Sequence, residues 1–329
     1  MHTVFFKNKP RILAGGTVAG PKECAGVVGA FVDKALLDDT FGESTYEKAE
    51  CKMLSFAAKK AMENARLKEE DVDLFISGDL LNQIISASFA ARDFDIPFLG
   101  VYGACSTMAE SIALASAFID AGYFEKIVAA TGSHFSSAER QYRYPLELGN
   151  TRPPQAQWTV TGAGATALGK DGSKIAVTSA TIGKVVDYGI TDVNNMGAAM
   201  APAACDTILT HLKETGRDEK YYDLIVTGDL GALGSRILKD LTWEKGVDIQ
   251  DNHVDCGEII YNVIEDEFQG GSGAGCSAVV FNSYLLDKLK RREINRILFA
   301  ATGALLSTVS SGQGESIPCI CHAVAIENI

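Results

Sequence analysis

Apolar runs of strand length alternate with amphipathic segments of helical period along most of this chain. In its first part, the amphipathic segment Ala49–Arg66 precedes the apolar run Asp73–Leu80. In its second part, Ala203–Glu214 precedes Asp223–Leu230 in the same way. Alternation of helices with buried strands is typical of a largely parallel sheet that carries helices on its faces.

The two apolar runs are copies of one motif. The sequence Asp-Leu-Phe-Ile-Ser-Gly-Asp-Leu at 73–80 returns as Asp-Leu-Ile-Val-Thr-Gly-Asp-Leu at 223–230, 150 positions later. A second pair, Lys126–Gly132 and Arg296–Gly303, shares a Thr-Gly that lies 171 positions apart, so the second copy is expected to carry about 21 additional residues. We therefore expect an α/β fold of two duplicated halves, 1–185 and 186–329, packed pseudo-symmetrically into one body. Ligand sites are then expected beyond the carboxyl ends of the strands.

Between the strands of the first half lies a polar, turn-rich segment. Ser133–Gln157 contains three of the chain's prolines and is expected to run over the site or over a dimer interface. The apolar runs Thr159–Leu168 and Ile175–Ile182 are expected to form a strand pair that closes this half. In the second half, the acidic stretch Glu265–Glu267 is expected in a solvated loop.

Composition narrows the classes of function. The formal net charge of −12 disfavours a nucleic-acid partner, because such proteins carry a basic face. The first ten residues do not resemble a secretory signal, and no stretch approaches the roughly 18 apolar residues of a membrane-spanning helix. Any association with a membrane is therefore expected to be peripheral.

Eight cysteines occur in the sequence, and they are expected to be free thiols in a reducing compartment. Cys319-Ile320-Cys321-His322 resembles a metal-binding fragment, but it lies in an apolar run that predicts a strand, and its spacing is not C-x-x-C. We predict no metal site and no resident cofactor.

The strongest chemical signal is the turn Gly103-Ala104-Cys105-Ser106-Thr107. An apolar strand, Pro97–Val101, precedes it and a long apolar helix follows it. A cysteine placed there lies at a helix N-terminus, where free amides and the helix dipole favour negative charge. That position suits a thiolate nucleophile and an anionic ligand equally well. The corresponding position of the second half is Val254–Gly257.

This strand, turn and helix in a duplicated α/β chain resembles the thiolase and ketoacyl-synthase superfamily. A closer resemblance is to the stage V sporulation protein AD (SpoVAD) family. It spans essentially the whole chain and is carried by six blocks, namely Thr17–Glu23, Ser77–Gln83, Ala138–Pro145, Ile190–Asp192, Met200–Ala204 and Ala301–Ser307.

This resemblance implies a thiolase-like body of five layers, α-β-α-β-α, and a homodimer. It also implies a role in the uptake or release of dipicolinic acid (pyridine-2,6-dicarboxylate) in spore-forming bacteria, beside membrane proteins of the same dipicolinate channel. The expected location is the forespore and spore, peripheral at the inner spore membrane. Calcium is expected only as part of the ligand, which is a calcium chelator.

The second half departs from the pattern of a condensing enzyme. Such an enzyme needs a cysteine and two further groups, histidines or an asparagine among them, that handle the proton and the thioester oxygen. Where a type III ketoacyl synthase has Pro-His-Gln-Ala-Asn, this chain has Thr227–Gly231, and where that family has Gly-Asn-Thr it has Val254–Gly257. Asp229 and Asp255 thus replace a base and an oxyanion donor. A carboxylate beside Cys105 would raise the thiol pKa and repel an enolate.

Two hypotheses remain open from the sequence. In the first, an inactive thiolase-type pocket binds one dipicolinate carboxylate through the amides of Cys105, Ser106 and Thr107. Arg140 and Arg143 are the candidate cations for the other carboxylate, with Lys184 as a second choice, although ordinary salt bridges are an alternative role for these side chains. In the second hypothesis, an acyltransferase or condensing enzyme acts on a CoA or carrier-protein thioester through Cys105, with His134 as its base.

The remaining candidates have alternatives of their own. Asp79 and Asp229, the acids related by the repeat, are expected either to orient His134 or contact a chelated metal, or to cap the helices that follow them. His134 is the histidine best placed for a site, because it follows a strand end, whereas His253 and His322 are expected to be structural.

Overall fold

The computed structural model describes residues 1–143, 145–261 and 269–329. Its strands fall into two sets. The first has the order β5-β4-β6-β8-β2, with β5 (Phe98–Gly100), β4 (Leu74–Gly78), β6 (Lys126–Ser133), β8 (Gly162–Gly169) and β2 (Arg11–Ala19). The second has the order β11-β10-β13-β14-β9, with β11 (His253–Asp255), β10 (Leu224–Thr227), β13 (Arg296–Ala304), β14 (Cys319–Asn328) and β9 (Ile175–Thr181).

The two sets have the same internal arrangement, which confirms the duplication. In the first, β4 pairs in parallel with β5 and β6, whereas β8 is antiparallel to both β6 and β2. In the second, β10 pairs in parallel with β11 and β13, whereas β14 is antiparallel to both β13 and β9. A single residue pair, Arg11 with Ala176, joins β2 to β9 and so connects the sets.

One strand assignment from the sequence is wrong. The runs at 159–168 and 175–182 do not pair with each other, because β8 lies between β6 and β2 while β9 pairs with β14 of the second set. The short N-terminal strand β1 (Thr3–Phe5) also pairs with β9. Ile175–Thr181 is therefore part of the second set of strands, although it precedes the second half in the sequence.

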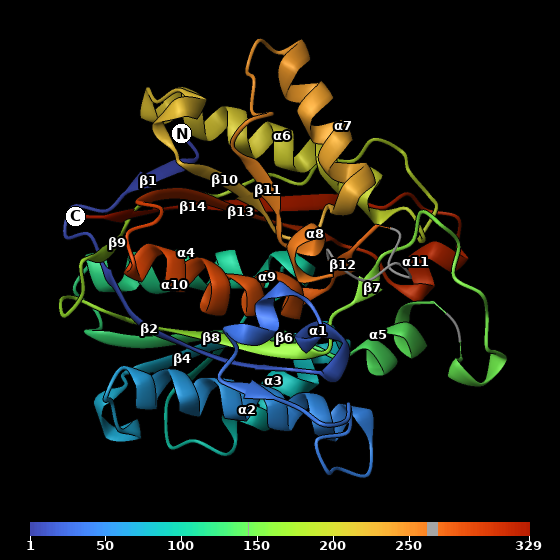
Figure 1. Ribbon diagram of the computed structural model, residues 1–329, viewed down its shortest axis with the longest axis horizontal. Coiled ribbons are helices and arrows are strands. Elements are labelled where there is room, and N and C mark those ends of the chain that lie inside the picture. Colours follow the sequence, from blue (N-terminus) through green and yellow to red (C-terminus); the bar gives the residue numbers. More distant parts are fainter. Residues whose placement is uncertain (144, 262–268) are drawn as a thin grey trace.

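Helices form three layers around the two sets of strands, so that the body has the five expected layers (Figure 1). The outer face of the first set is covered by α2 (Tyr46–Asn64) and α3 (Ile85–Ala91), and that of the second by α6 (Met196–Thr215) and α7 (Gly231–Glu244). Between the sets lie α4 (Thr107–Asp120), α9 (Ala274–Val280) and α10 (Leu286–Lys290), the last two joined by the π-helical turn η7 (Phe281–Leu285). Strands covered on both faces carry few polar side chains. In β4, for example, all five residues are buried and only Ser77 has a polar side chain.

Close approach of helix to strand depends on glycine at one place in particular. A Cβ added to Gly16 of β2 would lie 2.2 Å from the Ala61 amide nitrogen of α2. Alanines line the facing side of that helix, and Ala57, Ala58 and Ala61 are almost completely buried. Small side chains on both partners therefore let the backbone of α2 lie directly on the sheet.

Shorter elements complete the chain. They are α1 (Pro21–Cys24), η1 (Val27–Ala30), β3 (Lys34–Ala35), η2 (Glu69–Asp71), η3 (Asn82–Ile84), η4 (Ala104–Ser106), α5 (Phe135–Tyr142), η5 (Leu146–Leu148), β7 (Trp158–Thr159), η6 (Glu219–Tyr221), α8 (Cys256–Ile260), β12 (Gly271–Ser272) and α11 (Thr308–Gly312).

The additional residues of the second half lie partly between β11 and α9. There α8 and β12 have no counterpart in the described part of the first half. β12 pairs with β7, which follows directly after the polar segment 133–157. The acidic stretch Glu265–Glu267 lies outside the described residues. Cys319 and Cys321 are buried in β14, as the strand prediction requires. Within the described ranges, no helix combines the length and the apolar character that crossing a membrane requires.

Candidate functional site

Cys105 lies at the end of a tight turn whose backbone is strained. Ala104, directly before it, has a φ of +51°, a left-handed conformation that residues with a Cβ rarely adopt. The turn packs against β13 of the other half, where a Cβ on Gly303 would lie 2.2 Å from the Gly103 carbonyl oxygen. Left-handed geometry at a non-glycine residue costs about 1–3 kcal/mol and persists only where the surroundings enforce it. Here the second half of the molecule holds the first half's turn in place.

Most of the polar groups in this turn bond to each other. The Ser106 amide donates to the Gly103 carbonyl oxygen at 3.0 Å, and the Thr107 amide donates to the carbonyl oxygen of Ala104. The Ser106 hydroxyl donates to the Gly103 oxygen at 2.6 Å, and the Thr107 hydroxyl donates to the Ala104 oxygen at 2.7 Å. Two of the three amides predicted to hold a carboxylate are therefore engaged within the turn.

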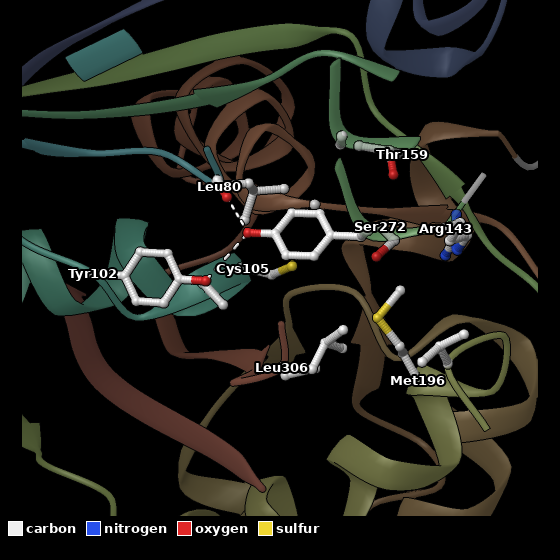
Figure 2. A pocket seen from close by; sticks show the side chains of 14 residues that line it. Leu80, Tyr102, Cys105, Arg143, Thr159, Met196, Ser272 and Leu306 are labelled. Atoms are coloured by element: carbon white, nitrogen blue, oxygen red, sulfur yellow. Dashed lines mark hydrogen bonds between the residues drawn. The ribbon is translucent and has the colours of Figure 1, made fainter. Parts of the chain in front are cut away.

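A cavity opens in front of Cys105 and encloses about 500 Å³ of empty space, its mouth included (Figure 2). Both halves contribute to its wall. The lining residues are Leu80, Tyr102, Ala104, Cys105, Ala138, Tyr142, Arg143, Thr159, Val193, Met196, Ser272, Gly273, Ala304 and Leu306. In Figure 2, Tyr102 lies on one side of Cys105, and Arg143 and Met196 lie on the other. Most of this wall is apolar, so a charged side chain within it is a candidate for binding a ligand.

Asp229 lies behind the Cys105 thiol and is completely buried. Its carboxylate accepts hydrogen bonds from the Ser272 hydroxyl and the Gly273 amide, both at 3.1 Å, and from the Thr302 hydroxyl at 2.9 Å. Burial raises the pKa of Asp229 to about 6. Burial and the neighbouring Asp229 charge together raise the pKa of the Cys105 thiol well above its ordinary value. The expectation of a carboxylate beside Cys105 therefore agrees with the geometry, and the thiol is protonated at neutral pH.

Arg143 is the cation of the cavity. Its side chain is only 4% exposed and makes one ion pair, from Nη1 to Glu139 at 2.8 Å. Its Nε and Nη2 atoms are buried and have no hydrogen-bond partner among the residues that the structure describes. Buried N–H groups of a guanidinium are costly to leave unpaired. Two such donors on one edge of the guanidinium match the two oxygens of a carboxylate.

Two tyrosines that the sequence analysis did not single out form another part of the wall. The Tyr142 hydroxyl donates to the Leu80 carbonyl oxygen and lies 3.3 Å from the Tyr102 hydroxyl. Tyr142 stands in the block 138–145 that carried the family resemblance, and that placement was the available signal. Ser272, another residue of the wall, was not singled out from the sequence either.

Several predicted site residues do not line the cavity. Arg140 pairs with Glu47 and is half exposed, and Lys184 pairs with Asp206 at 2.9 Å. Arg140 and Lys184 thus form ordinary salt bridges, which was the alternative considered for them.

The predicted carboxylate Asp79 and the predicted base His134 have structural partners. Asp79 accepts hydrogen bonds from the amides of Leu81 and Ala87 at 2.8 and 2.7 Å. His134 caps α5, since its Nδ1 accepts from the Ser136 amide at 3.1 Å, and its Nε2 lies 2.8 Å from the Asp39 carbonyl oxygen. Both ring nitrogens of this histidine are therefore occupied, away from Cys105.

Asp255 accepts several hydrogen bonds and caps two helices. It accepts hydrogen bonds from the Thr227 hydroxyl at 2.7 Å and from the backbone amides of Leu230, Gly231 and Gly257, each at 2.9 Å. Its side chain thus fixes the start of both α7 and α8. The other buried histidines are structural as well, since His253 lies 2.9 Å from the Thr227 hydroxyl and His322 accepts from the Gly183 amide. Among the described lining residues of the cavity there is no histidine.

Comparisons with known proteins identify the family and the fold. Residues 1–327 match the family model described as Stage V sporulation protein AD (SpoVAD). The chain is 45% identical over 325 residues to "Stage V sporulation protein AD" of Bacillus subtilis (strain 168), covering 99% of this chain and 96% of that protein. Its fold is similar to 3-oxoacyl-[acyl-carrier-protein] synthase III from Aquifex aeolicus (TM-score 0.58, 14% identity, 97% and 99% of the two chains). It is also similar to cerulenin-bound OleA from Xanthomonas campestris (TM-score 0.62, 14% identity, 98% of each chain). Because the identity to both solved structures is only 14%, the likeness shows the fold alone, which is thiolase-like.

Proposed function

This chain belongs to the stage V sporulation protein AD family, and on that premise we propose that it binds dipicolinic acid in the cavity at Cys105 without turning it over. The observation that carries the proposal is Arg143, whose Nε and Nη2 donors are buried without a partner in the described part of the chain, in the wall of a mostly apolar cavity. A flat aromatic carboxylate satisfies both features, since its ring suits the apolar wall and its carboxylate accepts both donors.

The second carboxylate of the ligand needs a different partner. The Cys105 amide is the one amide of the predicted set that is not engaged within the turn, and it lies at the N-terminal end of α4. A calcium ion chelated by the ligand would also neutralise this charge and would arrive with the ligand. Binding in the presence and absence of Ca²⁺ distinguishes these two arrangements.

Loss of catalysis is part of the proposal. A condensing enzyme needs a thiolate and groups that stabilise a developing oxyanion. Here the Asp229 charge and burial keep the thiol protonated, and histidine is absent from the described lining. The alternative, an acyltransferase acting through Cys105, predicts a stable acyl adduct on this residue after exposure to an acyl-CoA. Intact-mass measurement that finds the thiol unmodified counts against that alternative.

Substitution of Arg143 tests the binding site. We expect Arg143→Gln to weaken dipicolinate binding at least about tenfold, because hydrogen bonds to a charged group contribute about 1.5–3 kcal/mol each. Isothermal titration calorimetry measures the dissociation constant. Replacement of the thiol in Cys105→Ser is expected to weaken binding as well, by a smaller factor.

The matched control is Arg140→Gln, because Arg140 lies only three residues before Arg143, in α5, but is half exposed and paired with Glu47. We expect its dissociation constant to stay within about twofold of wild type, since exposed ion pairs contribute little. Titration of the wild-type protein that shows no saturable binding, with or without Ca²⁺, would refute the proposal.

We further propose that the protein works as a homodimer, peripheral to the inner membrane of the forespore and spore, beside membrane proteins of the same dipicolinate channel. Family membership supports the link to sporulation. The exposed edge of the first set of strands, at β5, supports the proposed dimer.

A further inference from the structure

A second hollow adjoins the cavity and shares part of its wall. This outer groove encloses about 1080 Å³ of space that is open to solvent, and it is lined by Leu80, Leu81, Asn82, Gln83, Ile84, Gly100, Val101, Tyr102, Tyr142, Leu305, Leu306, Ser307 and Ser310. Four of these residues, Leu80, Tyr102, Tyr142 and Leu306, also line the cavity at Cys105. These shared side chains therefore form part of the wall between the two spaces.

Hydrogen bonds at the surface hold this separating wall closed. The Tyr142 hydroxyl donates to the Leu80 carbonyl oxygen and contacts the Tyr102 hydroxyl, and Figure 2 shows both interactions beside Cys105. Gln141 donates to the same Leu80 oxygen at 2.9 Å and accepts from the Asn82 amide at 3.1 Å. Tyr102 is 44% exposed, so water can compete for these bonds.

The segment bonded to Tyr142 and Gln141 is strained. Gln83 and Ile84 both have left-handed backbones, with φ of +57° and +47°. A β-branched residue such as Ile84 seldom adopts this conformation. Asp79 fixes the segment on both sides by accepting from the Leu81 and Ala87 amides. The strained residues Gln83 and Ile84 thus lie between two backbone amides bonded to Asp79. The hydrogen bonds of Gln141 to Leu80 and Asn82 fix the start of this segment and also belong to the closed wall.

From this geometry we propose that Tyr102 and Tyr142 form a gate, through which an aromatic carboxylate passes from the outer groove into the cavity. The proposal rests on the proposed function for the identity of the ligand. Opening requires only that the Tyr142 hydroxyl leave the Leu80 oxygen and that its ring turn aside. Arg143 is the next residue along the chain, so the gate and the carboxylate-binding group lie at the same end of α5.

The gate is tested first without dipicolinate, through access to the Cys105 thiol. Tyr142→Phe keeps the ring and removes the hydroxyl that holds the wall closed. We expect the rate of Cys105 modification by methyl methanethiosulfonate to rise about threefold to tenfold, the range that corresponds to one net hydrogen bond. Mass spectrometry of peptides gives this rate relative to half-exposed Cys51 of the same molecule.

Three comparisons make this result specific. Tyr102→Phe is expected to act in the same direction, which covers the case that Tyr142→Phe fails to fold. Tyr123→Phe is the matched control, since this tyrosine is 74% exposed and lies outside both hollows, and its rate should equal that of wild type. The Cys105 pKa of each variant is also measured, from thiolate absorbance with the matching Cys105→Ala variant subtracted, because a lowered thiol pKa would raise the rate without any opening of the gate.

Stopped-flow measurement of dipicolinate binding separates the gate from the ligand assignment. Association and dissociation rates that both rise in Tyr142→Phe support a gate for this ligand. Cys105 modification that is unchanged in both tyrosine variants overturns the gate, even where dipicolinate binds normally. Faster modification without any saturable dipicolinate binding supports the gate and refutes the proposed function instead.

Discussion

At the scale of single residues, the Asp229 carboxylate beside the Cys105 thiol distinguishes this site from that of a condensing enzyme, which needs a thiolate. Asp229 is held by three donors, which are the Ser272 hydroxyl, the Gly273 amide and the Thr302 hydroxyl. Its charge disfavours a second negative charge on the adjacent sulfur. The chemistry of the thiol therefore depends on a carboxylate contributed by the other half of the molecule.

Neutralising this carboxylate should make the thiol more acidic. In Asp229→Asn, the amide oxygen can still accept from Gly273, and the NH₂ group can donate to the Thr302 hydroxyl, so the packing is retained. Because the negative charge is removed, we expect the Cys105 pKa to fall by at least about one unit. Thiolate absorbance near 240 nm, measured against pH with Cys105→Ala subtracted, reports the change, and an unaltered titration would show that burial alone sets this pKa.

The structure brings together some of the residues that sequence reasoning singled out and separates others, for physical reasons. Of the residues singled out from the sequence, Cys105 and Arg143 line the cavity, and Asp229 lies next to Cys105. Arg140 and Arg143 could not be told apart, because α5 ends at Tyr142 and the backbone of Arg143, with φ −125° and ψ −83°, no longer follows a helix. Helical spacing therefore does not give the direction of its side chain.

At the scale of elements, the end of β13 determines the conformation of the Cys105 turn. Gly303 has no side chain, and the carbonyl oxygen of Gly103 occupies the space that a Cβ would need. A strand from the second half and a turn from the first are thereby in direct backbone contact. The repeat predicted that both elements exist, but it could not predict that they touch, since this contact depends on how the halves pack.

Gly303→Ala is expected to separate these two elements. The added Cβ would lie 2.2 Å from the Gly103 oxygen and 3.3 Å from the Cys105 nitrogen, so the turn must move. Overpacking of this kind costs about 1–3 kcal/mol of the free energy of unfolding. Urea denaturation measures that loss, and dipicolinate affinity is expected to fall with it.

The control is Gly312→Ala in α11, where an added Cβ meets nothing within 4 Å. Its stability is expected to be equal to or slightly above that of wild type, because alanine favours helix. Equal stability of the two variants would contradict the close contact between β13 and the turn.

At the scale of the whole molecule, the order of strands leaves one edge of the first sheet uncovered. β5 pairs with β4 on one side only, and Phe98 in β5 is 37% exposed. Ile85 and Phe89 of the adjoining α3 are 40% and 44% exposed. An unpaired edge with apolar neighbours favours association with another chain. This edge is the surface through which we expect two copies to pair.

Sedimentation equilibrium tests the dimer. The wild-type protein is expected at about twice the 35.1 kDa of the chain. Phe89→Asp places a charge on the proposed interface and should yield the monomer. Phe5→Asp is the matched control, since Phe5 is 47% exposed on β1, at the second set of strands, and this variant should stay dimeric. A monomeric wild type, or a dimer that survives Phe89→Asp, would place the interface elsewhere or remove it.

The layered body as a whole was the most predictable feature, and the pairing of its inner strands was the least. Two copies of Asp-Leu-x-x-x-Gly-Asp-Leu mark β4 and β10 because a buried parallel strand needs a continuous apolar run. The run at 175–181 predicts a strand equally well, but nothing local in it favours β14 over β8 as its neighbour. That choice is made by the packing of residues more than a hundred positions apart.

The protonated state of the Cys105 sulfur also has a consequence for how the molecule ages. Peroxides attack thiolates far faster than thiols, and sulfinic or sulfonic products are irreversible. A pocket whose sulfur stays neutral, shielded by a neighbouring carboxylate, consequently keeps its shape through long exposure to oxidants without repair. The same charge that disfavours condensation chemistry is therefore expected to protect the Cys105 sulfur from oxidation.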